Sequence, residues 1–129
     1  MENRRVLIDT GIVIEYLRKQ NKGETRFVKL FKEFDLCLSV ISVFELYNGA
    51  INDKKLNDIE IVCKNLEIID FNLAISIKAS EIYRELRSQN KLIEFRDILI
   101  GATAIEQQMS IATNNKKHFN RLPQINIIT

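Results

Sequence analysis

Short, mostly apolar runs alternate along the chain with longer segments in which apolar residues recur at helical spacing. A short apolar run bounded by turn residues is typical of a strand that is buried on both faces of a parallel sheet. Such runs predict strands at 6–8, 36–41, 66–70 and 110–113. The segments between them predict helices at 10–18, from 25, at 42–51, 52–64 and 72–90, and from 97. Alternating strands and helices indicate an α/β fold around a parallel sheet.

The length and composition indicate one globular domain over residues 1–129. A late turn at 122–123 leads to 125–128, which could add an edge strand, and no repeat or linker interrupts the chain. Hydrophobic residues make up 46% and charged residues 28%, which excludes a disordered chain. No apolar run approaches the roughly 20 residues that span a bilayer, and no signal-peptide core follows the N-terminus. We therefore expect a cytoplasmic protein that does not enter a membrane.

The few cysteines and histidines limit the kinds of metal site. Cys37 and Cys63 form no CxxC pair, so we expect free thiols. His118 is the single histidine, which excludes a site built from several imidazoles. A bound metal would need oxygen ligands, and these favour Mg²⁺ or Mn²⁺. The net charge of +2 neither requires nor excludes a nucleic-acid partner.

Three carboxylates lie where the predicted strands meet the predicted helices. Asp9 follows the first strand directly, Glu45 lies in the first turn after the second strand, and Asp97 opens a helix that is apolar nearly all round. Ligands bind at the carboxyl edge of an open parallel sheet. A charge buried there is costly unless it is paired or bound to a metal. Together the three acids favour a site for a divalent cation.

Each acid also has a purely structural interpretation. Asp9 and Asp97 are both suitable N-caps for the helices that follow them. The spacing from Ser42 to Glu45 is that of a capping box, in which the glutamate reaches back to the backbone of the serine. Capping explains each residue taken singly, whereas the cation site explains why all three occur at such junctions.

Four blocks of sequence carry a resemblance to a known family. They are 6–10, 39–46 with Gly49, 97–104 and 112–119, and they span nearly the whole chain. In these blocks the sequence resembles PIN-domain ribonucleases, and among them the VapC-type toxins. The resemblance implies a PIN-like three-layer α/β/α fold with a central parallel sheet of four to five strands. It also implies that Asp9, Glu45 and Asp97 are the metal-binding, catalytic carboxylates.

The resemblance further implies an activity and partners. The expected activity is that of a Mg²⁺- or Mn²⁺-dependent endoribonuclease, the toxin of a type II toxin–antitoxin pair. It would cleave RNA, with tRNA as the commonest target, and leave a 5′-phosphate and a 3′-hydroxyl. Asp9 and Asp97 would bind the principal ion, and Glu45 would bind it through a water or orient the attacking water. The expected partners are a VapB-type antitoxin and a second copy of the chain.

The sequence departs from the family pattern after the fourth predicted strand. Many PIN domains carry a fourth acid there, but this chain has Asn115, which could ligate a metal only weakly. His118 stands where some relatives have a further acid. The alternatives are a plain turn or cap at Asn115 and a surface side chain at His118.

Several residues near the predicted site could contact RNA or a partner. Basic side chains bind phosphates, and hydroxyls could orient a phosphate or a metal-bound water. The alternatives are solvated charges and helix caps. The candidate substrate contacts are Thr10, Ser42, Arg96, Lys116, Lys117 and Arg121. Candidate antitoxin contacts are Leu17, Phe27, Phe31 and Phe34, of which the aromatic stripe from 27 to 34 fits core packing better.

Two other functions compete with the ribonuclease. A catalytically weak or silent PIN-like module that binds RNA would explain the missing fourth acid, and metal-dependent cleavage would distinguish it. A phosphatase of the haloacid-dehalogenase type would need a second aspartate two residues after Asp9, where the chain has Gly11. The acidic pair and later lysine of a receiver domain are also not evident.

Overall fold

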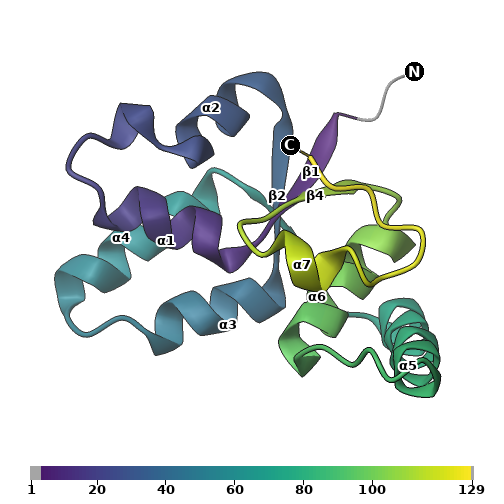
Figure 1. Ribbon diagram of the computed structural model, residues 1–129. Helices are drawn as coiled ribbons and strands as arrows, with labels where there is room; N and C mark the ends of the chain where they lie inside the picture. Colours follow the sequence, from purple (N-terminus) through teal and green to yellow (C-terminus); the bar gives the residue numbers. More distant parts are fainter. Residues whose placement is uncertain (1–3, 129) are drawn as a thin grey trace.

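The structure is a computed structural model that describes residues 4–128, and it has the alternating order of elements that the sequence predicts (Figure 1). The elements are β1 (Arg5–Ile8), α1 (Thr10–Arg18), the 3₁₀ turn η1 (Lys22–Glu24), α2 (Arg26–Glu33), β2 (Asp35–Ser39), α3 (Val40–Asn48), α4 (Asp53–Lys64), β3 (Glu67–Ile69), α5 (Leu73–Ser88), α6 (Phe95–Glu106), β4 (Ser110–Ala112) and α7 (Lys116–Phe119).

The four strands form one parallel sheet in the order β3-β2-β1-β4. This confirms the prediction of a central parallel sheet. The edge strand considered at 125–128 is reduced to a single bridge between Ile111 and Ile127. Within residues 4–128, Ile111 is the residue of β4 that makes backbone hydrogen bonds to this segment: its N–H donates to the carbonyl of Asn126, and its carbonyl accepts from the N–H of Ile128. The sheet therefore has four strands and one bridged edge.

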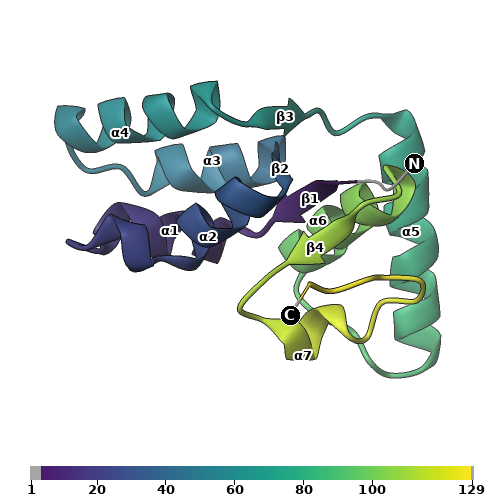
Figure 2. The same cartoon turned by 90° about the horizontal axis from the view of Figure 1, so that it is seen from above.

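Helices cover both faces of the sheet and give three layers (Figure 2). Successive side chains of a strand point to opposite faces. Accordingly, Val6 and Ile8 of β1 pack into the core under α1, α2 and α4, whereas Leu7 packs into the core under α5 and α6. The sheet is thus buried on both faces, as its apolar strands predict.

Two helices begin earlier than the sequence predicts. α3 begins at Val40 because Ser39 caps it, with its Oγ accepting a hydrogen bond from the N–H of Ile41 at 3.0 Å. The strand predicted at 36–41 therefore ends at Ser39, and the capping box from Ser42 to Glu45 is wrong. α6 begins at Phe95, which makes Asp97 its third residue and not its N-cap. An unbroken apolar run has no periodicity that marks where a strand gives way to a helix.

Both cysteines are free thiols, as predicted. Cys37 is buried in β2, and burial raises the pKa of its thiol to about 11. In α2, Phe27 and Leu30 are buried, as core packing requires, but Phe31 remains 48% exposed. Within residues 4–128, each helix is too short or too polar to cross a bilayer.

Candidate active site

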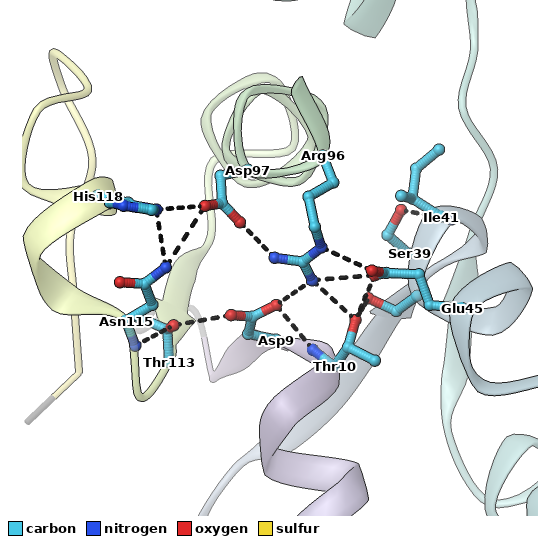
Figure 3. Close-up of polar contacts among 11 residues, drawn as sticks. Asp9, Thr10, Ser39, Ile41, Glu45, Arg96, Asp97, Thr113, Asn115 and His118 are labelled. Atoms are coloured by element: carbon cyan, nitrogen blue, oxygen red, sulfur yellow. Dashed lines mark hydrogen bonds and ion pairs between the residues drawn. The ribbon is translucent and has the colours of Figure 1, made fainter. Parts of the chain in front are cut away.

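The three predicted carboxylates converge at the carboxyl edge of the sheet (Figure 3). Asp9 follows β1 and also caps α1, because its Oδ1 accepts a hydrogen bond from the N–H of Thr10 at 2.8 Å. Glu45 comes from α3, and Asp97 comes from the first turn of α6. We call Asp9, Glu45 and Asp97 the acidic cluster. For Asp9, capping and membership of the acidic cluster hold together.

One guanidinium joins the acidic cluster. Arg96 Nη2 donates to Asp9 Oδ1 at 2.8 Å, and Arg96 Nε donates to Glu45 Oε2 at 2.7 Å. Nη2 also donates to Glu45 Oε1 at 2.9 Å, and Nη1 donates to Asp97 Oδ1. Burial lowers the pKa of Arg96, but hydrogen bonds to Glu45 and Asp9 outweigh it, so the pKa rises above its ordinary value. Arg96 is therefore a permanent cation at the centre of the site.

The negative charge of the acidic cluster exceeds the charge of this cation. The side chains of Asp97 and Asp9 are only 1% and 7% exposed, whereas those of Glu45 and Arg96 are 29% and 27% exposed. Three carboxylates face one guanidinium, and two of them have little contact with water. Buried charge without full compensation is unfavourable, so the site attracts further positive charge.

Thr113 supports Asp9 and was not among the residues singled out from the sequence. Its buried Oγ1 donates to Asp9 Oδ2 at 2.9 Å and accepts from the N–H of Asn115 at 2.9 Å. β1 and β4 are parallel neighbours with Ile8 opposite Ala112, so the residues that follow them lie side by side. A hydroxyl at the carboxyl end of the strand predicted at 110–113 was the signal that could have identified it.

The hydroxyls of Ser42 and Thr10 form a hydrogen-bonded chain that ends at Glu45. The Thr10 hydroxyl donates to Glu45 Oε1 at 2.8 Å and lies 2.7 Å from Ser42 Oγ. Thr10 is 3% exposed and Ser42 is fully buried. In this structure Thr10 positions Glu45 and Ser42 contacts Thr10, while their contact with substrate stays a prediction.

Asn115 and His118 both contact Asp97. His118 Nδ1 lies 2.7 Å from Asp97 Oδ2 and 2.8 Å from Asn115 Nδ2, while the amide is 3.5 Å from the same carboxylate oxygen. Asn115 precedes α7, but its side chain makes no capping hydrogen bond. Both side chains thus belong to the surroundings of the acidic cluster.

The other predicted basic contacts lie at the surface. Lys116 and Lys117 are exposed on α7, which follows Asn115 directly. Arg121 is also exposed and donates through Nη1 to the carbonyl of Leu92 at 3.1 Å. α7 therefore carries exposed positive charge close along the chain to Asn115 and His118.

The acidic cluster suits a divalent cation in its chemistry but is arranged around Arg96. Carboxylate oxygens are the ligands that Mg²⁺ and Mn²⁺ prefer. However, the guanidinium of Arg96 already lies between these oxygens, and it is an organic cation and not a metal ion. Within the described part of the chain, no group of three or more Asp, Glu, His or Cys side chains is arranged to hold a metal ion as it stands. With the guanidinium of Arg96 between them, the three carboxylates thus form no metal site as they stand.

A groove lined by residues of α1, α3 and α4 begins at Glu45, the one member of the acidic cluster that lines it. Its volume is about 270 Å³, and Glu45 lies in its wall. Leu17 and Leu46 give it an apolar lining, and Arg18 and Asp58 add charge. The groove therefore offers an apolar surface next to Glu45.

Comparisons of the sequence and of the structure with known proteins agree with one another. The sequence profile of the PIN domain matches residues 6–125. The chain is 32% identical over 126 residues to Ribonuclease VapC1 of Methanocaldococcus jannaschii, covering 98% of this chain and 87% of that one. It is 25% identical over 122 residues to the tRNA(fMet)-specific endonuclease VapC of Shigella flexneri, covering 92% of each. The toxin–antitoxin structure of DNA-bound VapBC from Salmonella typhimurium matches with a TM-score of 0.83 and 25% identity, covering 96% of each chain.

Proposed function

The chain belongs to the PIN-domain family as a VapC-type member, and we propose on this basis that it is a metal-dependent endoribonuclease, the toxin of a type II toxin–antitoxin pair. The observation that carries the proposal is the convergence of three carboxylates, from the end of β1, from α3 and from α6, on the guanidinium of Arg96. A buried concentration of negative charge weakens packing, but it is what phosphodiester hydrolysis with a divalent cation requires.

The proposed chemistry assigns a role to each side chain. Asp9 and Asp97 would hold Mg²⁺ or Mn²⁺, with Glu45 binding through a water or directly. An ion held there would supply the positive charge that lowers the pKa of a water and offsets charge on the leaving oxygen. With the 3′-oxygen as the leaving group, the products are a 5′-phosphate and a 3′-hydroxyl. Thr113 fixes the carboxylate of Asp9, and Thr10 fixes that of Glu45. Rigid support of this kind keeps reacting groups in position.

We propose RNA, and tRNA in particular, as the substrate. The name of the Shigella flexneri relative, a tRNA(fMet)-specific endonuclease, supports this choice. The exposed Lys116 and Lys117 are close enough along the chain to Asn115 to bind phosphates of an RNA at the site. Arg96 could join them only after leaving the acidic cluster.

We propose a VapB-type antitoxin and a second copy of the chain as partners. The similarity to VapBC from Salmonella typhimurium supports the antitoxin, and the groove lined by Leu17 offers it an apolar surface. An antitoxin arginine could reach Glu45 in the wall of this groove and pair with it. For the homodimer, α5 exposes Leu73 and Ile77, which are 77% and 52% exposed and would gain from burial.

Cleavage of tRNA tests the proposal. Purified protein, freed of any partner, is incubated with total tRNA in Mg²⁺ or Mn²⁺ and, separately, in EDTA. We expect discrete fragments with 5′-phosphate ends only in the metal arms. The silent RNA-binding module remains a second candidate because Asn115 replaces the fourth acid. RNA that is bound but uncut in every arm would favour that candidate.

A further inference from the structure

Arg96 precedes Asp97 directly on α6, yet its guanidinium contacts every member of the acidic cluster. We propose that Arg96 is a built-in counter-cation that competes with the divalent metal. It holds the acidic cluster in the metal-free protein, it must leave when the metal binds, and it thereby weakens the apparent metal affinity. This proposal rests on the proposed function and concerns the regulation of the same site.

The hydrogen bonds show why both cations cannot bind together. Arg96 uses Asp9 Oδ1, both oxygens of Glu45 and Asp97 Oδ1. The remaining oxygens of the two aspartates are engaged on their other sides. Thr113 donates to Asp9 Oδ2, and His118 and Asn115 contact Asp97 Oδ2. A metal at the centre of the acidic cluster would need the oxygens that the guanidinium now holds.

The charges lead to the same conclusion. Without metal, one guanidinium offsets part of the charge of three carboxylates, so Arg96 stabilises the metal-free protein. With metal added and Arg96 unmoved, a divalent cation and a guanidinium would share the same oxygens in a site with little water. Repulsion between such close like charges is strong where the effective dielectric constant is low. Displacement of Arg96 removes this repulsion.

The position of Arg96 permits this displacement. It is the second residue of α6, where the helix meets the connection from α5, and its side chain is 27% exposed. The neighbouring Phe95 is 69% exposed, so the start of the helix faces solvent. A long arginine side chain can rotate outward from here while Asp97, which is 1% exposed, stays in place. The released guanidinium would remain near the mouth of the site.

Binding of Mn²⁺ to metal-free protein tests the proposal without measuring activity. Titration calorimetry compares the wild type with Arg96→Gln, and melting in EDTA compares their stabilities. We expect Arg96→Gln to bind Mn²⁺ at least tenfold more tightly and to melt at a lower temperature in EDTA. We expect Arg96→Lys to lie between them, because one ammonium cannot bridge three carboxylates. The matched control is Arg5→Gln, which breaks the 2.9 Å ion pair with Glu67 at the opposite end of β1 and should leave Mn²⁺ affinity unchanged.

The possible outcomes distinguish the proposed role of Arg96 from the proposed metal-dependent function. A variant Arg96→Gln that is unfolded in EDTA but folds when Mn²⁺ is added supports the proposal, since the metal then replaces the missing cation. If the wild type binds Mn²⁺ clearly and Arg96→Gln and Arg96→Lys bind it equally or more weakly, the proposed role of Arg96 is wrong. The proposed metal site is then still supported. If none of the proteins binds Mn²⁺, the proposed metal-dependent function fails and this inference fails with it.

Discussion

Thr113→Val tests the support of Asp9 with almost no change of shape. The valine keeps the size of threonine but removes a buried hydroxyl that donates to Asp9 Oδ2 and accepts from the N–H of Asn115, each at 2.9 Å. A hydrogen bond to a charged group contributes about 1.5–3 kcal/mol, and a buried N–H left without an acceptor adds to the loss. Since Asn115 is partly exposed and can bind water, we expect a total loss of about 2–4 kcal/mol.

The control for this variant is Thr113→Ser, which keeps the hydroxyl and loses one methyl group. That loss should cost about 1 kcal/mol. For a chain of this length, Thr113→Val should lower the melting temperature in EDTA by about 6–15 °C. Urea unfolding gives the free energy directly, and Mn²⁺ titration should show weaker binding because Asp9 is no longer fixed. If Thr113→Val proves as stable as Thr113→Ser, the hydroxyl does not hold Asp9 as described.

Four further predictions concern the charges and the thiols. Mg²⁺ at 100 times its Kd should stabilise the wild type by about 2.7 kcal/mol, and Asp97→Asn should show no such shift in thermal melting. Asn115→Asp adds a carboxylate beside Asp97 and should tighten Mn²⁺ binding in calorimetry; unchanged affinity would place residue 115 outside the metal site. The pKa of Cys37 is raised from 9.0 to about 11, so its thiol stays protonated at pH 8. Cys63, which is only partly buried, should react with a thiol reagent at pH 8 well before Cys37 does. Because the folded pKa of Cys37 exceeds the unfolded one, its contribution to stability is full below about pH 9 and is lost as the pH rises through about 11.

The parallel sheet and the meeting of its carboxylates could be predicted because they depend on local pattern and strand order. Buried strands are nearly continuous apolar runs, and acids that follow such strands share one edge of the sheet. The starts of α3 and α6 could not be located in this way. Ser39 and Ser42 are both suitable caps within one apolar stretch, and the structure uses Ser39.

The contacts between side chains across the site could not be predicted from the sequence. Arg96 is next to Asp97 along the chain, which predicted a phosphate contact, but its bonds to Asp9 and Glu45 depend on how three elements pack. Thr113 lies beside Asp9 only through the register of β4 against β1. Hydrogen bonds between distant residues are set by tertiary structure, and a single sequence does not specify them.

The most direct test of the central claim is the dependence of RNA cleavage on metal and on Asp97 in one protein preparation. Cleavage of an RNA pool is measured in EDTA, then after addition of Mn²⁺ in excess, for the wild type and for Asp97→Asn. We expect that Mn²⁺ starts cleavage by the wild type, that a second addition of EDTA stops it, and that Asp97→Asn cleaves in neither condition. Equal cleavage with and without Mn²⁺, or cleavage by Asp97→Asn at the wild-type rate, would contradict this expectation.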